Sequence, residues 1–460
     1  MPNQSAASAI PASPAETVGG RLPMRQSLLL GSLMFGLFFG AGNLIFPVSL
    51  GLLSGSAVWP AAAGFLVAAV GLPILGVVAS AMSHTASLHE LASRVHPVFA
   101  VVFTCALYLT IGPFFAIPRT ATVSYEMAFG ARLDGGGARL ALLVFSAIFF
   151  GLVLLASLRP GRLLDYVGRY LTPLFLVLLG ILLVVALGGG PGGPAPAPSE
   201  LYASHAASQG VIDGYNTMDA LASLAFAIVI IESVRRLGVS SPTRIAAEVG
   251  RAGIVAALAM GVIYTALAVL GAASTTLVER EANGAVALAS VSQHHFGTAG
   301  LVLAAAIMLV ACLKTAIGLV TSCAEMFATM FPRSLGYRGW AVLFTLASFG
   351  FANVGLETII TAAVPVLALL YPLAITMILL GLLSPLVQGR PWAHRLPMAV
   401  VGLVSVLALL AAATDLWPSG ADWAARAGGV LPGFELGFGW ILPGIVGLVT
   451  GMLVPGRRQG

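Results

Sequence analysis

The sequence predicts an all-α polytopic membrane protein with twelve transmembrane helices. Of its 460 residues, 58% are hydrophobic and only 8% are charged, whereas soluble domains carry about 25% charged residues. Apolar runs of about 20 residues, the length that crosses a bilayer, recur along the whole chain. The net charge of +5 comes almost wholly from arginines in short loops. We therefore expect a lipid bilayer as the partner and no nucleic acid.

The apolar runs define the predicted spans. They lie at 26–50, 56–82, 97–129, 139–158, 164–188, 211–233, 252–276, 297–330, 339–353, 356–385, 397–415 and 434–454. The ninth run is short, because Gly350, Asn353 and Gly355 interrupt it.

Charge and composition of the connections predict the domain organisation. Most arginines fall in loops on the side of the N-terminus, so both termini are expected in the cytoplasm. Residues 1–24 lack the basic and apolar regions of a signal peptide and are expected to form a disordered cytoplasmic tail. A Gly/Pro-rich external linker at 189–210 separates five spans in 25–188 from five in 211–385, as in an inverted repeat. Residues 386–460 add the last two spans and a short C-terminal tail.

The first span contains a stretch that is poorly suited to a plain helix. Gly40 and Gly42 each cost about 1 kcal/mol relative to alanine in a helix interior, and Pro47 costs about 3 kcal/mol. Asn43 adds an amide side chain. Backbone groups freed at membrane depth are tolerated only where they line a cavity enclosed by protein. The stretch therefore predicts a binding site of the kind that transporters build from broken helices.

Ionisable residues within spans are functional candidates by default. Arg119 follows Pro113 and Pro118 in the third span. It either extends to the outer interface or pairs with an acid, Glu126 or Asp219, as an outer gate. Asp219 itself opens the sixth span, where a helix N-terminus also tolerates an acid.

Three further side chains are candidates for a cavity wall. Tyr108 lies near the middle of the third span, either as a packed aromatic or with its hydroxyl on a substrate carboxylate. Ser223 and Phe226 follow Asp219 at helical spacing, which places a carboxylate, a hydroxyl and an aromatic ring along one stripe.

The eighth span carries oxygen ligands and the only lysine of the chain. The Gly318 carbonyl and the Thr321 and Ser322 hydroxyls are hard ligands that suit Na⁺, although such hydroxyls also bond the preceding carbonyls of their own helix. Lys314 needs a partner or must lose its proton. It is a candidate for an internal cation or proton carrier near the ion site, or for a salt bridge to a loop.

Four segments together resemble the signature segments of a known family. They are FFGAGNLIFP (38–47), GPFFAIPRTA (112–121), NTMDALASLAF (216–226) and ACLKTAIGLVTSCAE (311–325). They are similar to those of the bacterial branched-chain amino acid:cation symporters (BrnQ-type, LIVCS family), in the same order and spacing. The resemblance covers all twelve spans. It implies the amino acid–polyamine–cation superfamily and a LeuT-type 5+5 inverted repeat in which helices 1 and 6 are discontinuous.

The resemblance also implies roles for the residues named above. Backbone groups of Gly40, Ala41, Gly42 and Asn43 would hold the substrate α-carboxylate, with Ser223 and Phe226 as contacts from the sixth span. The carbonyls of Gly36 and Phe39 would join Gly318, Thr321 and Ser322 in a sodium site.

Two positions depart from the family pattern. Ala225 and Ala227 stand where relatives often have glycine, so the break in helix 6 is not visible in the sequence. Lys314 replaces a threonine found in some members. A cation there is expected to weaken Na⁺ binding or to make H⁺ the coupling ion.

We expect a Na⁺-coupled importer of leucine, isoleucine and valine in the cell membrane, with no cofactor and no enzymatic activity. An apolar pocket separates substrates that differ by one methylene by only ~1–3 kcal/mol, so discrimination among the three should be poor. The first alternative is coupling to H⁺ through Lys314 or Asp219. A channel or an intramembrane enzyme is a remote alternative, because the spans carry no cluster of acids, histidines or cysteines at catalytic spacing.

Overall fold

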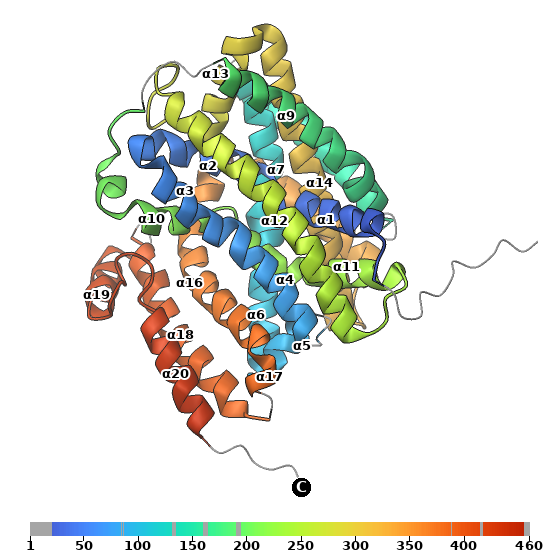
Figure 1. Ribbon diagram of the computed structural model, residues 1–460, viewed down its shortest axis with the longest axis vertical. Helices are drawn as coiled ribbons and strands as arrows, with labels where there is room; N and C mark the ends of the chain where they lie inside the picture. The colour runs from blue at the N-terminus through green and yellow to red at the C-terminus, as the bar shows by residue number, and fades with distance from the viewer. Residues whose placement is uncertain are drawn as a thin grey trace, which may run out of the picture.

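The computed structural model is a bundle of helices, and the residues it describes contain no strand (Figure 1). It describes residues 21–83, 85, 87–130, 135–159, 164–189, 195–387, 389–414 and 417–454. Residues 1–20 of the predicted tail, 190–194 of the predicted linker and the end of the chain from 455 lie outside this part.

Twenty α-helices follow one another along the described chain. They are α1 (Met24–Phe38), α2 (Ala41–Ser54), α3 (Val58–Leu66), α4 (Leu72–Met82), α5 (Leu88–Ser93), α6 (Pro97–Leu109), α7 (Ala116–Tyr125), α8 (Gly135–Ser157), α9 (Thr172–Gly188), α10 (Glu200–Tyr215), α11 (Asp219–Arg236), α12 (Pro242–Ala273), α13 (Gly284–Phe296), α14 (Thr298–Met330), α15 (Gly336–Ala352), α16 (Leu356–Leu382), α17 (Ser384–Val387), α18 (Pro391–Ala412), α19 (Pro418–Gly428) and α20 (Ile441–Leu453). Short 3₁₀ or π segments join several of them: η1 (Gly55–Ala57), η2 (Val67–Gly71), η3 (Thr110–Phe114), η4 (Glu126–Gly130) and η6 (Leu164–Leu171).

Many of these helices are long and apolar enough to cross a membrane. Within the described ranges there are eight such segments, or nine when the bent pair α10 and α11 is taken as one span. Helices α1 and α20 are apolar but shorter. The count of twelve spans stays a prediction.

The first span is broken at the place that the sequence predicts. Helix α1 ends at Phe38 and α2 starts at Ala41, with extended backbone at Phe39 and Gly40 between them. The Asn43 side chain accepts a hydrogen bond of 2.9 Å from the Gly40 N–H, which satisfies an amide that the break leaves free. A β-carbon at Gly40 would lie 3.0 Å from the Thr315 side chain of α14, so glycine lets the break between α1 and α2 approach α14 closely.

The sixth span is also broken, at Asn216–Met218. Helices α10 and α11 meet there at 44°, and Met218 adopts left-handed backbone with a φ of 63°. A non-glycine residue pays about 1–3 kcal/mol for such a conformation, so the surrounding contacts hold it in place. The break precedes the positions at which the relatives' glycines would have indicated it, because α11 runs unbroken through Ala225.

Helix α10 begins at Glu200, within the stretch predicted as a linker to residue 210. Packing against α3 explains this helix better than its own apolar content does. A β-carbon on Gly64 of α3 would lie 1.9 Å from the Ala207 carbonyl oxygen, and one on Gly210 of α10 would lie 2.0 Å from the Ala61 carbonyl oxygen. Small residues permit this close approach, which holds helices together in membranes.

Replacing Gly210 with valine is expected to destabilise the protein, because the new side chain meets backbone that cannot move aside. Overpacking costs about 1–3 kcal/mol. The apparent melting temperature of the purified protein in detergent measures the loss. Gly261→Val in α12, where a β-carbon would meet nothing within 4 Å, is the matched control. Equal melting temperatures for the two variants would contradict the close contact of α3 and α10.

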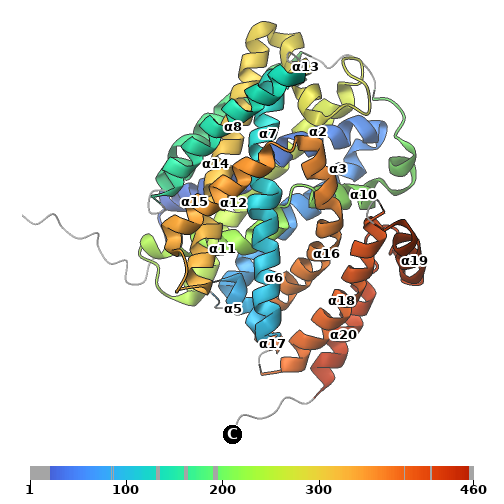
Figure 2. The same cartoon turned by 180° about the vertical axis from the view of Figure 1, so that it is seen from behind.

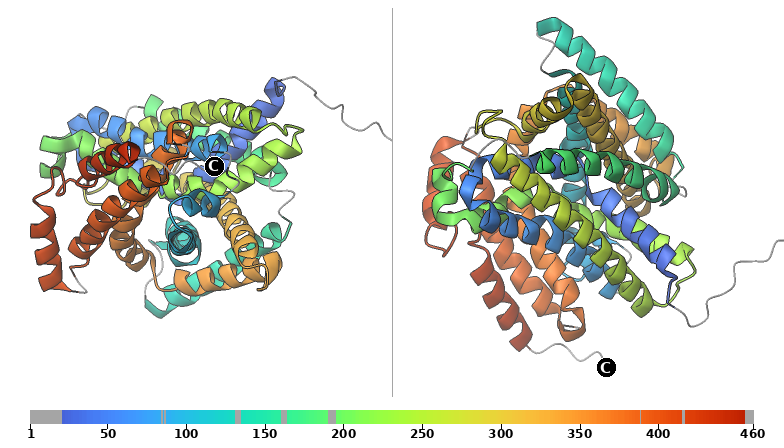
Figure 3. Two further views of the ribbon diagram at one scale, coloured as in Figure 1. Left: turned by 90° about the horizontal axis from the view of Figure 1, so that it is seen from below. Right: turned by 45° about the horizontal axis from the view of Figure 1, so that its top comes forward.

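The remaining helices enclose the two broken ones. Helix α12 runs diagonally beside α1, α2 and α4 (Figure 1). On the opposite side of the bundle lie α6, α8, α15 and α16 (Figure 2). Helices α18, α19 and α20 gather at one edge in each further view (Figure 3). Helix α8 exposes Leu140, Ile148 and Leu155 along its outer face, as suits a surface in contact with lipid.

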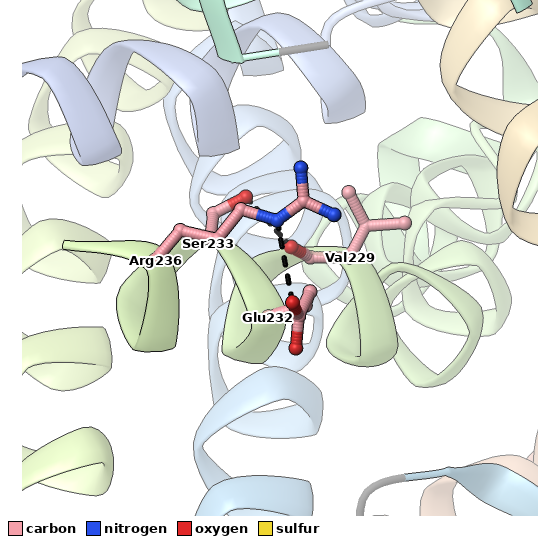
Figure 4. A network of polar contacts seen from close by, with 4 residues as sticks. All are labelled: Val229, Glu232, Ser233 and Arg236. Carbon is pink, nitrogen blue, oxygen red and sulfur yellow. Dashed lines mark hydrogen bonds and ion pairs between the residues drawn. The ribbon is translucent and has the colours of Figure 1, made fainter. Parts of the chain in front are cut away.

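The far end of α11 is polar and exposed. There the Arg236 guanidinium pairs with the Glu232 carboxylate at 3.2 Å, and Ser233 donates to the Val229 carbonyl at 2.7 Å (Figure 4). An exposed pair of this kind is worth at most about 1 kcal/mol. Its polarity indicates that this end of α11 has left the apolar interior, whereas the Asp219 end is buried within it.

Candidate functional site

A central cavity lies between the two helix breaks. Its walls come from the break between α1 and α2, the break between α10 and α11, and facing parts of α7 and α14. It is lined by Leu37, Phe38, Gly40, Ala41, Gly42, Asn43, Ile111, Ala116, Arg119, Thr120, Thr217, Met218, Asp219, Ala222, Phe226, Thr315 and Leu319. The cavity thus joins an aliphatic and aromatic wall to one buried base and one buried acid.

The substrate residues predicted from the sequence divide into two groups. Gly40, Ala41, Gly42, Asn43 and Phe226 line the cavity. The other two predicted substrate residues do not.

Tyr108 and Ser223 are fully buried and make contacts elsewhere. The Tyr108 hydroxyl donates to the Ala225 carbonyl at 3.3 Å. The Ser223 hydroxyl donates to the Ala220 carbonyl at 2.7 Å and faces Gly76 of α4. The stripe expected on α11 therefore splits: Asp219 and Phe226 face the cavity, whereas Ser223 faces the neighbouring helix.

Asn43 connects the two breaks directly. Its amide oxygen accepts from Gly40, and its amide nitrogen donates to the Asp219 carboxylate and the Tyr264 hydroxyl. Tyr264 belongs to α12 and also donates to Asp219 at 3.5 Å. Tyr264 is not among the residues predicted from the sequence, because a lone tyrosine in an apolar span carries no local sign of its partner.

Arg119 closes the cavity from α7. Its terminal nitrogens donate to the carbonyls of Asn216 at 2.9 Å and Thr217 at 3.4 Å, and its guanidinium lies 5.4 Å from the centre of the Phe46 ring. The side chain is only 6% exposed, so it does not extend to an interface. A cation at the C-terminal end of α10 is favoured by the helix dipole. Of the two acids proposed as its partner, Glu126 is exposed, and Asp219 makes no ion pair with it among the described residues.

Lys314 occupies the end of α1. Its ammonium donates to the carbonyl oxygen of Gly36 at 3.0 Å and to that of Phe39. Three aromatic rings surround it: its nitrogen lies 5.5 Å from the ring centres of Phe35 and Phe39 and 4.8 Å from that of Phe175. The side chain has no solvent exposure. Carbonyl dipoles and the faces of aromatic rings both stabilise a cation. These groups therefore form a cation site, and the Lys314 ammonium occupies it.

The other residues proposed for sodium lie further along α14. The Ser322 hydroxyl donates to the Ala225 carbonyl at 2.7 Å, Gly318 packs against Leu37 and Phe226, and Thr321 lies beside Tyr337. Residues 314 and 321 are two helical turns apart, about 10 Å along the axis. The structure therefore brings the Gly36 and Phe39 carbonyls to Lys314, and it turns the Ser322 hydroxyl toward α11 instead.

The described part of the chain is a helical bundle with a cavity between two broken spans, and this is the architecture of a secondary transporter. Solved transporters share it: a nucleobase-cation-symport-1 family transporter in a closed, bromovinylhydantoin-bound form (TM-score 0.54, 14% identity, 87% of this chain and 93% of that one) and MhsT in complex with L-phenylalanine (TM-score 0.54, 15% identity, 94% and 99%). The family model "Branched-chain amino acid transport protein" matches residues 23–457, and the chain belongs to this family.

Named relatives extend the match over nearly the whole chain. The branched-chain amino acid permease BrnQ of Lactobacillus delbrueckii subsp. lactis is 45% identical over 92% of this chain and 95% of its own length. BraB of Bacillus subtilis is 41% identical over 94% and 96%. BrnQ of Escherichia coli K12 is 40% identical over 94% and 96%. These relatives are permeases, so the chain is a transporter of LeuT-type fold and not an enzyme.

Proposed function

We propose that this chain imports leucine, isoleucine and valine across the bacterial cell membrane, with the amino acid bound in the central cavity. The permeases named above support the substrate class. The observation that carries the proposal is the cavity itself, in which an aliphatic wall including Leu37, Ile111 and Leu319 adjoins the charged groups of Arg119 and Asp219. A branched aliphatic side chain suits the first part and an amino acid head group suits the second.

The same cavity supports transport by alternating access. Its walls are built from both halves of the chain, since α1, α2 and α7 precede the Gly/Pro-rich segment and α11 and α14 follow it. A substrate that contacts both halves favours the state in which they close on it, because a ligand shifts a conformational equilibrium by its differential affinity for the two states.

For the coupling ion, we propose that the Lys314 ammonium takes the place of a bound Na⁺, so that uptake does not require Na⁺. A Na⁺ ion bound to the same carbonyls would lie within a few ångströms of the ammonium. At an effective dielectric constant of 20, two unit charges 4 Å apart repel by about 4 kcal/mol. Coupling to Na⁺ therefore requires Lys314 to leave Gly36 and Phe39 or to lose its proton. Coupling to H⁺ requires Lys314 or Asp219 to exchange a proton during the cycle.

Uptake of labelled isoleucine into proteoliposomes tests both parts of this proposal. An inward H⁺ gradient should drive accumulation, and replacing Na⁺ by choline should change the rate less than twofold. Unlabelled leucine and valine should compete, whereas lysine and glutamate should not. Accumulation that follows Na⁺ and ignores pH would reject the coupling proposal. No accumulation of any branched-chain amino acid under either gradient would reject the substrate class.

Thr321→Ala distinguishes the two cation sites in the same assay. Under the Lys314 proposal it leaves the response to Na⁺ unchanged, because Thr321 does not contact the Gly36 and Phe39 carbonyls. If the variant needs more Na⁺ than the native protein, the result would instead support the sodium site predicted at Gly318, Thr321 and Ser322.

A further inference from the structure

We propose that Arg119 and Asp219 bind the two charged groups of the amino acid: the Arg119 guanidinium binds the α-carboxylate, and the Asp219 carboxylate binds the α-ammonium. This assignment rests on the proposed function, since it requires an amino acid in the central cavity. It replaces the role of these two side chains as partners in a gate.

The first support is that the two groups are buried together but do not form an ion pair with each other. Asp219 is 3% exposed, Arg119 is almost as buried, and both line the same cavity. Within the part of the chain that the structure describes, no ion pair joins these two side chains. Burying a charge is unfavourable unless an opposite charge is placed beside it. A zwitterion between them supplies the missing partner of each.

Arg119 retains a free donor and faces the first turn of α2. Its Nη1 and Nη2 atoms are used by backbone carbonyls, but its Nε–H is buried with no acceptor among the described residues. A β-carbon at Gly42 would lie 3.1 Å from Nη2, so this glycine keeps the space in front of the guanidinium open. Gly42 lies in the first turn of α2, where unpaired N–H groups and the helix dipole favour a carboxylate.

Asp219 retains a free acceptor. Its Oδ2 atom accepts from Asn43 and Tyr264. Neither of these two hydrogen bonds ends on its Oδ1 atom, and the Thr217 side chain lies beside the carboxylate. The other buried cation nearby, Lys314, is held by the carbonyls of α1. An ammonium group with three donors fits the remaining acceptor of Asp219.

Asp219 also stands at the start of α11, where an acid caps the helix dipole, so the test must separate binding from helix stability. Isoleucine has two truncated analogues that do this: 3-methylpentanoate lacks the amino group, and 2-methylbutylamine lacks the carboxylate. Competition of each compound against labelled isoleucine, on the purified full-length protein in detergent, gives relative affinities.

The Asp219→Asn variant should lose isoleucine affinity by at least about tenfold while its affinity for 3-methylpentanoate stays within twofold. The Arg119→Gln variant should show the complementary result: its affinity for isoleucine should fall at least about tenfold, whereas its affinity for 2-methylbutylamine should stay within twofold. Glu325→Gln, which removes a partly buried acid of α14 outside the cavity, is the control and should change none of the three affinities. Equal losses for isoleucine and 3-methylpentanoate in Asp219→Asn would overturn the assignment.

If Asp219→Asn binds none of the compounds, Asp219→Glu decides the question. This variant keeps the charge and should restore the preference for isoleucine over 3-methylpentanoate. Failure of both variants to bind, with normal elution on size-exclusion chromatography, overturns the proposal. Failure of the native protein to bind isoleucine would instead reject the proposed function.

Discussion

Replacing Lys314 with threonine is expected to make isoleucine uptake depend on Na⁺. The variant removes the ammonium that donates to Gly36 and Phe39. Each buried carbonyl left without a partner costs about 1–3 kcal/mol. The new hydroxyl and that of Thr315, which already donates to Leu37 at 3.4 Å, add oxygen ligands beside the two carbonyls. In proteoliposomes, uptake by the variant should fall at least tenfold when choline replaces Na⁺, whereas native uptake should not.

Lys314→Met is the matched control for this prediction. Methionine fills similar space but supplies neither a charge nor a hard oxygen, so this variant should be slow with and without Na⁺. A threonine variant that transports at the native rate in choline would show that the carbonyls need no cation, and the proposed role of Lys314 would then be wrong.

Replacing Asn43 with leucine is expected to abolish substrate binding. The substitution keeps the approximate shape but removes the acceptor for Gly40 and the donor for Asp219 and Tyr264. Hydrogen bonds to charged groups are worth about 1.5–3 kcal/mol, and the loss also frees the backbone at the break. We expect isoleucine affinity to fall at least about 100-fold, as measured by binding of labelled isoleucine to the purified protein.

Asn353→Leu is the same substitution at a position outside the cavity. Asn353 donates to the Ser146 hydroxyl at 3.2 Å and to the Phe349 carbonyl at 2.8 Å, so its loss tests for nonspecific damage. This control should bind isoleucine within about twofold of the native protein. Native affinity in Asn43→Leu would show that the connection between the two breaks is dispensable.

Local chemistry explains which parts of the site were predictable. The break in the first span could be predicted from Gly40 and Gly42, because glycine destabilises the interior of any helix. The break in the sixth span depends on left-handed backbone at Met218, a residue with no such local preference, so nothing in the sequence marked its position. Tyr264 likewise joins the site only because α12 packs against α2.

The cation site shows the same division. The family resemblance implied a role for the Gly36 and Phe39 carbonyls, and the sequence singled out the one lysine, Lys314. The sequence did not decide whether Lys314 or Thr321 meets these carbonyls, because residues seven positions apart lie close to the same face of a helix. Only the packing of α14 against the end of α1 places the Lys314 ammonium on the two carbonyls.

The sequence by itself determined that this protein lies in a lipid bilayer and that its first span is broken at Gly40 and Gly42. Both follow from terms that act within a few residues: the transfer of apolar side chains to lipid and the cost of glycine and proline in a helix. The tertiary structure decided which charges stay unpaired. Arg119, Asp219 and Lys314 lie far apart in the chain, and their partners depend on how separate helices pack.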